Sequence, residues 1–206
     1  MAGGDYIVIT VEGKGGHAAN PHSTIDTTLV ASQIVSSIQT IAARNADPLK
    51  SIVVSVCSFM TDTDAHNVIP GTVILKGTVR TMEDEIRDLA EKNLSLICEN
   101  TARAFGASAT VDYRRGYPVM INSEKETMIA KEIGYSVTGN ETHDVPPVMG
   151  AEDFSFMLNE RPGAYILIGN GDSAAVHNPN YNFNDDIIPT GVAYWTKLTK
   201  SRLRTP

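Results

Sequence analysis

The chain has 206 residues, of which 42% are hydrophobic and 6% aromatic, as is ordinary for a globular protein of one large or two small domains. Its formal net charge is −7 and its lysines and arginines are scattered, which argues against nucleic acid or an anionic membrane as the main partner. No apolar run approaches ~18 residues, and the N-terminus lacks the basic and apolar regions of a signal peptide, so we expect no membrane span and a cytoplasmic setting.

The first 117 residues predict four strands and two helices. Apolar residues alternate in the first strand, whereas in the helices they recur at intervals of three and four residues. The expected elements are strands at 6–12, 51–60, 72–80 and 108–117, a helix at 23–44, and a helix from Thr81, where Asp84 completes a capping-box pattern, to Gly106. This order predicts an α+β ferredoxin-like fold, with a four-stranded antiparallel sheet and both helices on one face. We expect Cys57 and Cys98 to be two buried thiols rather than a disulfide.

Pro118 marks the expected boundary with a second segment, 118–206. Its predicted elements are a helix to about Ser136, capped by Asn122 or by Ser123 with Glu126, a turn at 148–157 that leads into a short helix, a buried parallel strand at 164–168, and a helix at 190–203 that buries Val192, Trp195 and Leu198. One buried strand with three helices is too little for a covered parallel sheet. We therefore expect this segment to be the C-terminal portion of a larger α/β domain.

Five dispersed residues are candidates for chemistry: His17, Asn67, Arg80, Glu152 and His177. Each has a plain structural alternative, namely a polar loop, a turn-forming side chain, a solvated charge at a strand end, an acid at a helix N-terminus and a loop histidine. Around the first of them, glycines at 13, 15 and 16 permit positive φ and a close approach to whatever the histidine faces.

Single motifs exclude several enzyme classes. The glycine-rich stretch at 169–174 follows a predicted strand and resembles a dinucleotide-binding loop, but His177-Asn178-Pro179 follows it where that loop needs a helix. There is no Gly-x-Ser-x-Gly, His-Glu-x-x-His or Cys-x-x-Cys motif in the sequence. A serine hydrolase and a simple one-motif zinc enzyme are therefore unsupported.

Taken together, the dispersed candidates belong to an ordered series of short motifs. The series runs Gly-Lys-Gly-Gly-His-Ala-Ala-Asn-Pro-His at 13–22, Asp26, Asn-Val-Ile-Pro at 67–70, Gly-Thr-Val-Arg at 77–80, Glu-Asp-Phe at 152–154, Pro-Gly at 162–163 and His-Asn-Pro at 177–179. It resembles the two-metal aminoacylase and carboxypeptidase family, in the amidohydrolase branch of hippurate hydrolases, auxin-conjugate hydrolases and acetyl-diaminopimelate deacetylases. The resemblance implies metal-dependent hydrolysis of amide bonds in N-acyl amino acids or small peptides.

The resemblance also implies a domain layout. Residues 5–117 would form the lid, which is also the dimerisation domain, and residues 118–206 would form the last part of the catalytic domain. A homodimer through the lid is expected, because an antiparallel sheet with an exposed edge strand can pair with its symmetry mate.

Roles for the five candidates follow from the same resemblance. His17 would reach into the partner's active site and stabilise the oxyanion of the tetrahedral intermediate. Asn67 and Arg80 would contact the carboxylate or backbone of the substrate. His177 would be a ligand of zinc, manganese or cobalt, and Glu152 is characteristic of the branch without a firm role.

The family's other metal ligands and its general-base glutamate belong to a segment before the lid that this sequence does not contain. Two hypotheses follow. In the first, the chain supplies the lid and one metal ligand to a metal-dependent amidohydrolase, and by itself it binds no metal and is inactive. In the second, the chain is a catalytically inactive dimerisation or binding fragment. It could be an excised piece of an enzyme, a gene fragment or half of a split enzyme.

Overall fold

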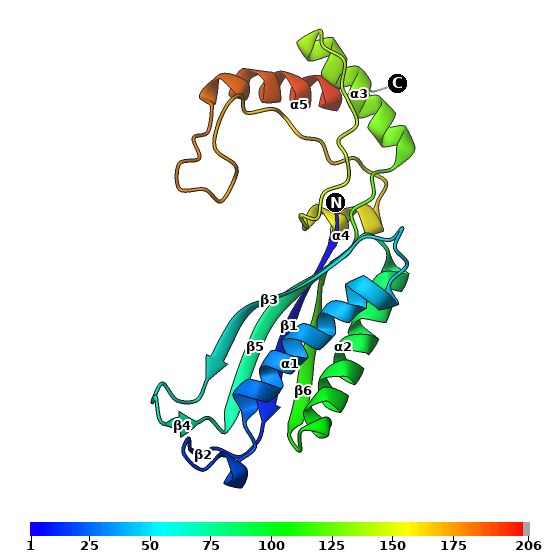
Figure 1. Cartoon of the computed structure of the whole chain (residues 1–206). Coiled ribbons are helices and arrows are strands. Elements are labelled where there is room, and N and C mark those ends of the chain that lie inside the picture. Colours follow the sequence, from blue (N-terminus) through cyan, green and yellow to red (C-terminus); the bar gives the residue numbers. More distant parts are fainter. Residues whose placement is uncertain (204–206) are drawn as a thin grey trace. The chain divides into compact units, whose positions relative to one another are not determined.

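The computed structural model describes residues 1–203, and the chain forms two compact units (Figure 1). The first, which we call the sheet unit, comprises Met1–Met120 and Pro147–Phe156. The second, which we call the helical unit, comprises Ile121–Pro146 and the chain from Met157 onward.

The sheet unit is built on one four-stranded antiparallel sheet. Its strands are β1 (Gly3–Glu12), β3 (Ile52–Thr61), β5 (Thr72–Thr81) and β6 (Ser108–Tyr117), in the spatial order β3-β5-β1-β6. Figure 1 shows α1 (Thr27–Thr40) and α2 (Asp84–Ala104) on the same face of this sheet. This is the expected ferredoxin-like order, so the prediction of a four-stranded antiparallel sheet is confirmed.

Short elements complete the sheet unit. They are β2 (Gly16–His17), which pairs with β4 (Val68–Ile69), a 3₁₀ turn at Pro21–Ser23 and a π-helical turn at Ile41–Asn45 that follows α1 directly. The predicted helix at 23–44 therefore begins later than expected. The Asp26 carboxylate sets the start, because it accepts hydrogen bonds from the backbone N–H groups of Thr28 and Leu29 at 2.9 and 3.2 Å.

The core lies between the sheet and its two helices. Inward-facing residues of β1 pack there with apolar residues of α1 and α2, and all are fully or almost fully buried: Ile7, Ile9, Val11, Ile34, Ile38, Leu94 and Cys98. Alternation along the strand and helical spacing along the helices produce this single apolar layer. Burial raises the pKa of the Cys98 thiol to about 12, since the thiolate would lose its solvation.

Two expectations for the sheet unit are wrong. Cys57 is exposed instead of buried, because it lies on the edge strand β3 where the β3–β5 register shifts between Val56 and Ser58. Both cysteines are free thiols, as predicted. Helix α2 begins at Asp84 without a side-chain cap. Thr81 cannot cap it, because this residue is the buried last residue of β5.

The helical unit contains α3 (Glu124–Thr138) and α5 (Ile188–Arg202), and a 3₁₀ turn at Asp185–Ile187 leads into α5. The Lys197 ammonium donates a hydrogen bond to the Ser136 carbonyl at 3.2 Å, and Tyr194 is 5% exposed. The remaining helix, α4 (Phe154–Glu160), spans the sequence boundary between the two units.

Three expectations for the helical unit are also wrong. The Ser123 hydroxyl accepts a hydrogen bond from the Gly163 N–H at 3.2 Å instead of capping α3. Residues 164–168 form no strand, and both backbone groups of Tyr165 are bound by the Asn122 side chain at 2.9 Å, where a neighbouring strand would have been needed. Trp195 is 60% exposed, as is Val192, while Leu198 is partly buried. Among the helices of residues 1–203, none has the length and apolarity to cross a bilayer.

Candidate functional site

His17 and Asn67 lie together at one end of the sheet unit. His17 is in β2 of the small β2–β4 ribbon and is paired with Val68, while Asn67 directly precedes β4 and its carbonyl accepts a hydrogen bond from the Ala18 N–H at 2.9 Å. The ribbon is tied to the main sheet, because the Gly13 N–H donates to the Gly71 carbonyl at 3.0 Å just before β5. Both candidate side chains are exposed.

The ring of His17 is oriented by its own turn. Its Nδ1 accepts a hydrogen bond from the Ala19 N–H at 3.1 Å, so the neutral imidazole carries its proton on Nε2. An exposed Nε2–H is therefore available as a donor. This is the tautomer that could stabilise a negatively charged oxygen.

The glycines before His17 allow a close approach of backbone segments. A Cβ atom added to Gly13 would lie 2.6 Å from the Ile25 carbonyl oxygen, and one added to Gly15 would lie 2.8 Å from that of Ile69. The expectation of positive φ in this turn is wrong, because the left-handed glycines of the described chain are at 106, 139 and 171. Extended glycine is needed here for space.

Arg80 lies at the opposite end of the sheet. In β5 it is paired with Gly4 of β1 on one side and Val53 of β3 on the other. Arg87 and Arg115 pair with carboxylates, whereas the side chain of Arg80 has no hydrogen bond or ion pair within residues 1–203. A half-buried guanidinium in this state is suited to bind an anion.

Glu152 lies at the same end of the sheet unit as Arg80. The Ala2 N–H donates to the carbonyls of Val148 and Gly150 at 3.1 and 3.0 Å, which holds this segment against the start of β1. One Glu152 carboxylate oxygen accepts a hydrogen bond from the Asp153 N–H at 3.1 Å. The structure thus brings Glu152 toward Arg80 and leaves His17 and Asn67 at the far end.

The distance between the two ends follows from strand register. Thr72 pairs with Glu12 at the end of the sheet that carries the ribbon, and Arg80 pairs with Gly4 at the other. These eight residue steps span about 26 Å at ~3.3 Å per residue. Figure 1 shows β2 and β4 beyond one end of the sheet and the chain's N-terminus near the other. Within one chain, His17 and Arg80 cannot contact the same small substrate.

His177 belongs to the helical unit. It is exposed and has a φ of 67°, the one left-handed conformation of a non-glycine residue among residues 1–203. A turn in which the Asn178 N–H donates to the Ala175 carbonyl at 3.1 Å surrounds it. Such backbone costs on the order of 1–3 kcal/mol and is concentrated at functional sites.

The residues that could hold a metal are incomplete. Within residues 1–203, no three or more His, Cys, Asp or Glu side chains lie together in a way that could hold an ion. A closed or catalytic zinc site needs at least three protein ligands. The described residues alone therefore do not complete a metal site, and His177 offers a single imidazole.

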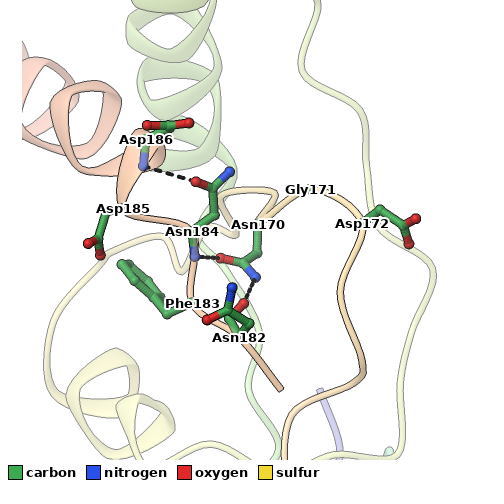
Figure 2. A pocket seen from close by; sticks show the side chains of 8 residues that line it. All are labelled: Asn170, Gly171, Asp172, Asn182, Phe183, Asn184, Asp185 and Asp186. Carbon is green, nitrogen blue, oxygen red and sulfur yellow. Dashed lines mark hydrogen bonds between the residues drawn. The ribbon is translucent and has the colours of Figure 1, made fainter. Parts of the chain in front are cut away.

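A cavity of about 440 Å³ is lined by residues 170–172 and 182–186, which precede and follow His177 in the chain (Figure 2). Asn170 holds its rim together, because its side chain donates to the Asn182 carbonyl and accepts from the Asn184 N–H, both at 2.8 Å. Three aspartates and no lysine or arginine line it. This acidic lining disfavours a phosphate and agrees with the exclusion of dinucleotide binding.

Some motif residues have structural roles. Asp26 caps α1, and the Pro70 carbonyl accepts a hydrogen bond from the buried Thr27 hydroxyl at 2.8 Å. Sequence reasoning missed Gly4, which borders the guanidinium of Arg80. The only signal for it is the pair of glycines at the start of the first strand.

The profile of peptidase family M20/M25/M40 matches residues 7–201. Hippurate hydrolase of Campylobacter jejuni is 31% identical over 206 residues, which is 99% of this chain and 54% of that protein. IAA-amino acid hydrolase ILR1-like 5 of Arabidopsis thaliana is 32% identical over 208 residues, 96% of this chain and 48% of that protein. N-acetyl-L-cysteine deacetylase of Bacillus subtilis is 32% identical over 188 residues, 91% of this chain and 45% of that protein.

Among solved structures, a dinuclear metal-binding peptidase of the M20 family from Bacillus subtilis superposes with a TM-score of 0.78 at 25% identity. That match covers 100% of this chain and 52% of the other. The chain thus spans about half the length of the relatives that it matches.

Proposed function

We propose, on the premise that the chain belongs to peptidase family M20/M25/M40, that it forms the lid and the last part of the catalytic domain of a metal-dependent amidohydrolase. Membership of the family agrees with the resemblance that the ordered motifs carry. In the proposed layout, residues 5–117 are the lid and residues 118–206 belong to the catalytic domain.

The proposed substrates are N-acyl amino acids or small peptides. The names of three relatives specify hippurate, IAA-amino acid conjugates and N-acetyl-L-cysteine as substrates. Each of these compounds has an amide next to a carboxylate. An enzyme for this class needs a donor for the oxyanion of the cleaved amide and a cation for the carboxylate.

The observation that carries the proposal is the separation of these two groups in one chain. His17 offers an Nε2–H donor and Arg80 an uncommitted guanidinium, but the length of the sheet lies between them. A single substrate can meet both only when they come from different copies of the chain. A homodimer in which each lid serves the partner's site would satisfy this requirement.

In this arrangement, the His17 imidazole donates a hydrogen bond to the oxyanion as the amide carbonyl is attacked. Arg80 of the other copy holds the substrate carboxylate, and the Asn67 amide contacts the substrate beside His17. His177 is the proposed metal ligand. Glu152 directly follows Ala151, which lies beside Gly4 as Arg80 does, so Glu152 is at the same end of the sheet as Arg80.

The metal, zinc, manganese or cobalt, would supply an activated water and polarise the amide carbonyl. Because the described residues do not complete its site, the other ligands and the general base are assigned to a segment outside this chain. The coverage of about half of each relative is consistent with this assignment.

The dimer contact is proposed at the β3 edge of the sheet. Strand β3 carries no charged residue and exposes Val53, Phe59 and Met60 by 39%, 45% and 41%. The other edge strand, β6, carries the charged residues Asp112, Arg114 and Arg115, and such charges oppose pairing between the edges of two sheets.

A second candidate function is a dimerisation or binding module without catalysis. The absence of a three-ligand cluster from residues 1–203 favours it for the chain in isolation. The two candidates differ in whether activity appears when the remaining segment is supplied.

Hydrolysis of an N-acyl amino acid panel tests the proposal. The purified chain, with zinc, cobalt or manganese, is assayed alone and after addition of the N-terminal half of a related hippurate hydrolase. We expect activity only in the mixture, lost in His17→Ala and His177→Ala and retained in the matched control His66→Ala, an exposed histidine beside Asn67. A mixture that stays inactive would favour the module, and activity of the chain alone would contradict the split site.

A further inference from the structure

The structure contains a notch at the start of β1 that receives the side chain of Arg80. The outer face of the sheet has a row formed by Val53, Arg80, Gly4 and Tyr117, one residue from each strand. On the β3 side, Arg80 meets a branched valine side chain. On the β1 side it meets a residue without one, and the guanidinium lies over Gly4.

The distances show how closely this space is filled. A Cβ atom added to Gly4 would overlap Nη1 of Arg80 and lie 3.1 Å from its Cζ. The same atom would lie 2.9 Å from Cβ of Ala151, so the notch has a second wall. Gly4 does not have a positive φ, and its backbone would accept an alanine. Glycine is required at position 4 because the Arg80 guanidinium occupies the space that a side chain would need.

The notch is held rigid from beneath. Gly4 is followed by a shift in the β1–β6 register, which leaves Gly116 of β6 as the extra residue. The N–H of Gly116 donates to the buried Asp5 carboxylate at 2.9 Å. The bulge therefore fixes the strand at the residue next to Gly4.

We propose that Gly4 is a positioning residue, which holds the guanidinium of Arg80 across β1 toward Ala151 and so determines the preference of the site for a substrate carboxylate. The inference rests on the proposed function of Arg80 and adds the residue that fixes its direction. Gly4 acts through Arg80 and does not touch the substrate.

The variant Gly4→Ala should displace the Arg80 guanidinium while the sheet stays folded. Two atoms must yield to the added Cβ. Nη1 of Arg80 is the free end of a flexible side chain and can swing away, whereas the Ala151 Cβ, at 2.9 Å, must shift slightly with its own segment. Neither atom belongs to the backbone of a strand, so the sheet can keep its register. The matched control is Gly3→Ala in the same strand. Its added Cβ would lie 3.3 Å from the Tyr117 carbonyl oxygen and 3.4 Å from Val119, and Arg80 is not among its three nearest neighbours.

The test uses ¹⁵N-labelled full chain and two probes, hippurate and its uncharged analogue hippuramide. The side-chain Nε–H signal of Arg80 is assigned by its loss in Arg80→Gln and followed during titration, and a nuclear Overhauser contact between Gly4 Hα and the Arg80 side chain is sought without probe. Thermal unfolding of each variant is recorded alongside.

We expect wild type and Gly3→Ala to show the contact and to bind hippurate in preference to hippuramide. Gly4→Ala should lose the contact and roughly tenfold or more in hippurate affinity, with hippuramide affinity and unfolding temperature unchanged. If Arg80→Gln abolishes the preference but Gly4→Ala retains it, the positioning role is overturned and the role of Arg80 stands. If wild type does not distinguish the two probes, the proposed role of Arg80 is contradicted, and this inference with it.

Discussion

The Asp5 carboxylate and the Arg87 guanidinium form a buried ion pair, with side chains 2% and 7% exposed and an Nε–Oδ2 distance of 2.9 Å. The Tyr113 hydroxyl and the Gly116 N–H also donate to this carboxylate, at 2.7 and 2.9 Å. The pair thus joins β1, α2 and β6 directly beneath the notch at Gly4. Removal of this ion pair should lower the free energy of unfolding and should also disturb the position of Gly4 beside Arg80.

Substitution Asp5→Ala is expected to lower the free energy of unfolding by roughly 3–5 kcal/mol, because it leaves the Arg87 charge buried without its partner. Urea unfolding followed by circular dichroism measures this. The matched control is Asp112→Ala, which breaks the exposed Arg114–Asp112 pair and should change stability little. Equal losses of unfolding free energy in the two variants would show that the buried pair stabilises the fold no more than the exposed pair does.

Stability should also depend on pH through Asp5. Burial alone would raise its pKa, but hydrogen bonds from Arg87, Tyr113 and Gly116 outweigh burial and hold the pKa below the ordinary 3.8. In the unfolded chain the carboxyl takes up a proton at higher pH than in the folded chain. The stabilisation is therefore complete above about pH 4 and is lost as the pH falls through the folded-state pKa.

Comparison of wild type with Asp5→Asn by urea unfolding from neutral to acidic pH checks this dependence. The difference in unfolding free energy between the two should be largest near neutrality and should shrink as the solution is acidified below about pH 4. A difference that stayed constant over this range would mean that Asp5 titrates alike in the folded and unfolded chains.

The proposed dimer should depend on the apolar edge strand. Phe59→Lys places a charge on β3 and is expected to shift the chain from dimer to monomer, since a lysine on an edge strand opposes pairing. Light scattering at several concentrations measures the mass. Thr110→Lys makes the same change on the β6 edge and should leave the dimer intact. A monomeric wild type, or a dimer disrupted only by Thr110→Lys, would contradict the proposed contact.

Trp195 reports on the apolar surface of α5. It is the only tryptophan, it is 60% exposed, and the neighbouring Val192 is exposed to the same extent. We expect red-shifted emission that iodide quenches readily, and protection from quenching once the N-terminal half of a related hydrolase is added. Blue-shifted emission without quenching in the isolated chain would mean that this face of α5 is already covered.

Much of the sheet unit could be predicted from local pattern. The predicted strand at 108–117 coincides with β6, and that at 72–80 differs from β5 by one residue. In the first strand, alternation of apolar residues correctly marked the buried face, which carries Ile7, Ile9 and Val11. The order of elements then leaves few topologies, and the observed one is the expected ferredoxin-like order.

The errors have tertiary causes. The apolar run at 164–168 reads as a strand, but strands need a partner, and in the described chain Asn122 binds its backbone instead. Cys57 is exposed by a register shift that no local pattern announces. The motifs indicated His17 and Arg80, but only strand register reveals that they lie at opposite ends of the sheet. Gly4 borders Arg80 and Ala151, which are distant from it in sequence, so a pair of glycines at the start of the first strand was the only local signal for it.

Metal retention shows whether this chain carries one ligand of a metal site that a further segment completes. The purified chain is loaded with zinc or manganese and dialysed, and its metal content is measured by mass spectrometry, with His177→Ala in parallel. We predict that the chain alone retains no stoichiometric metal and that retention appears with the N-terminal half of a related hydrolase and is weakened by His177→Ala. Retention of roughly two ions per isolated chain, the content of a complete dinuclear site, would show instead that this chain alone holds the whole metal site.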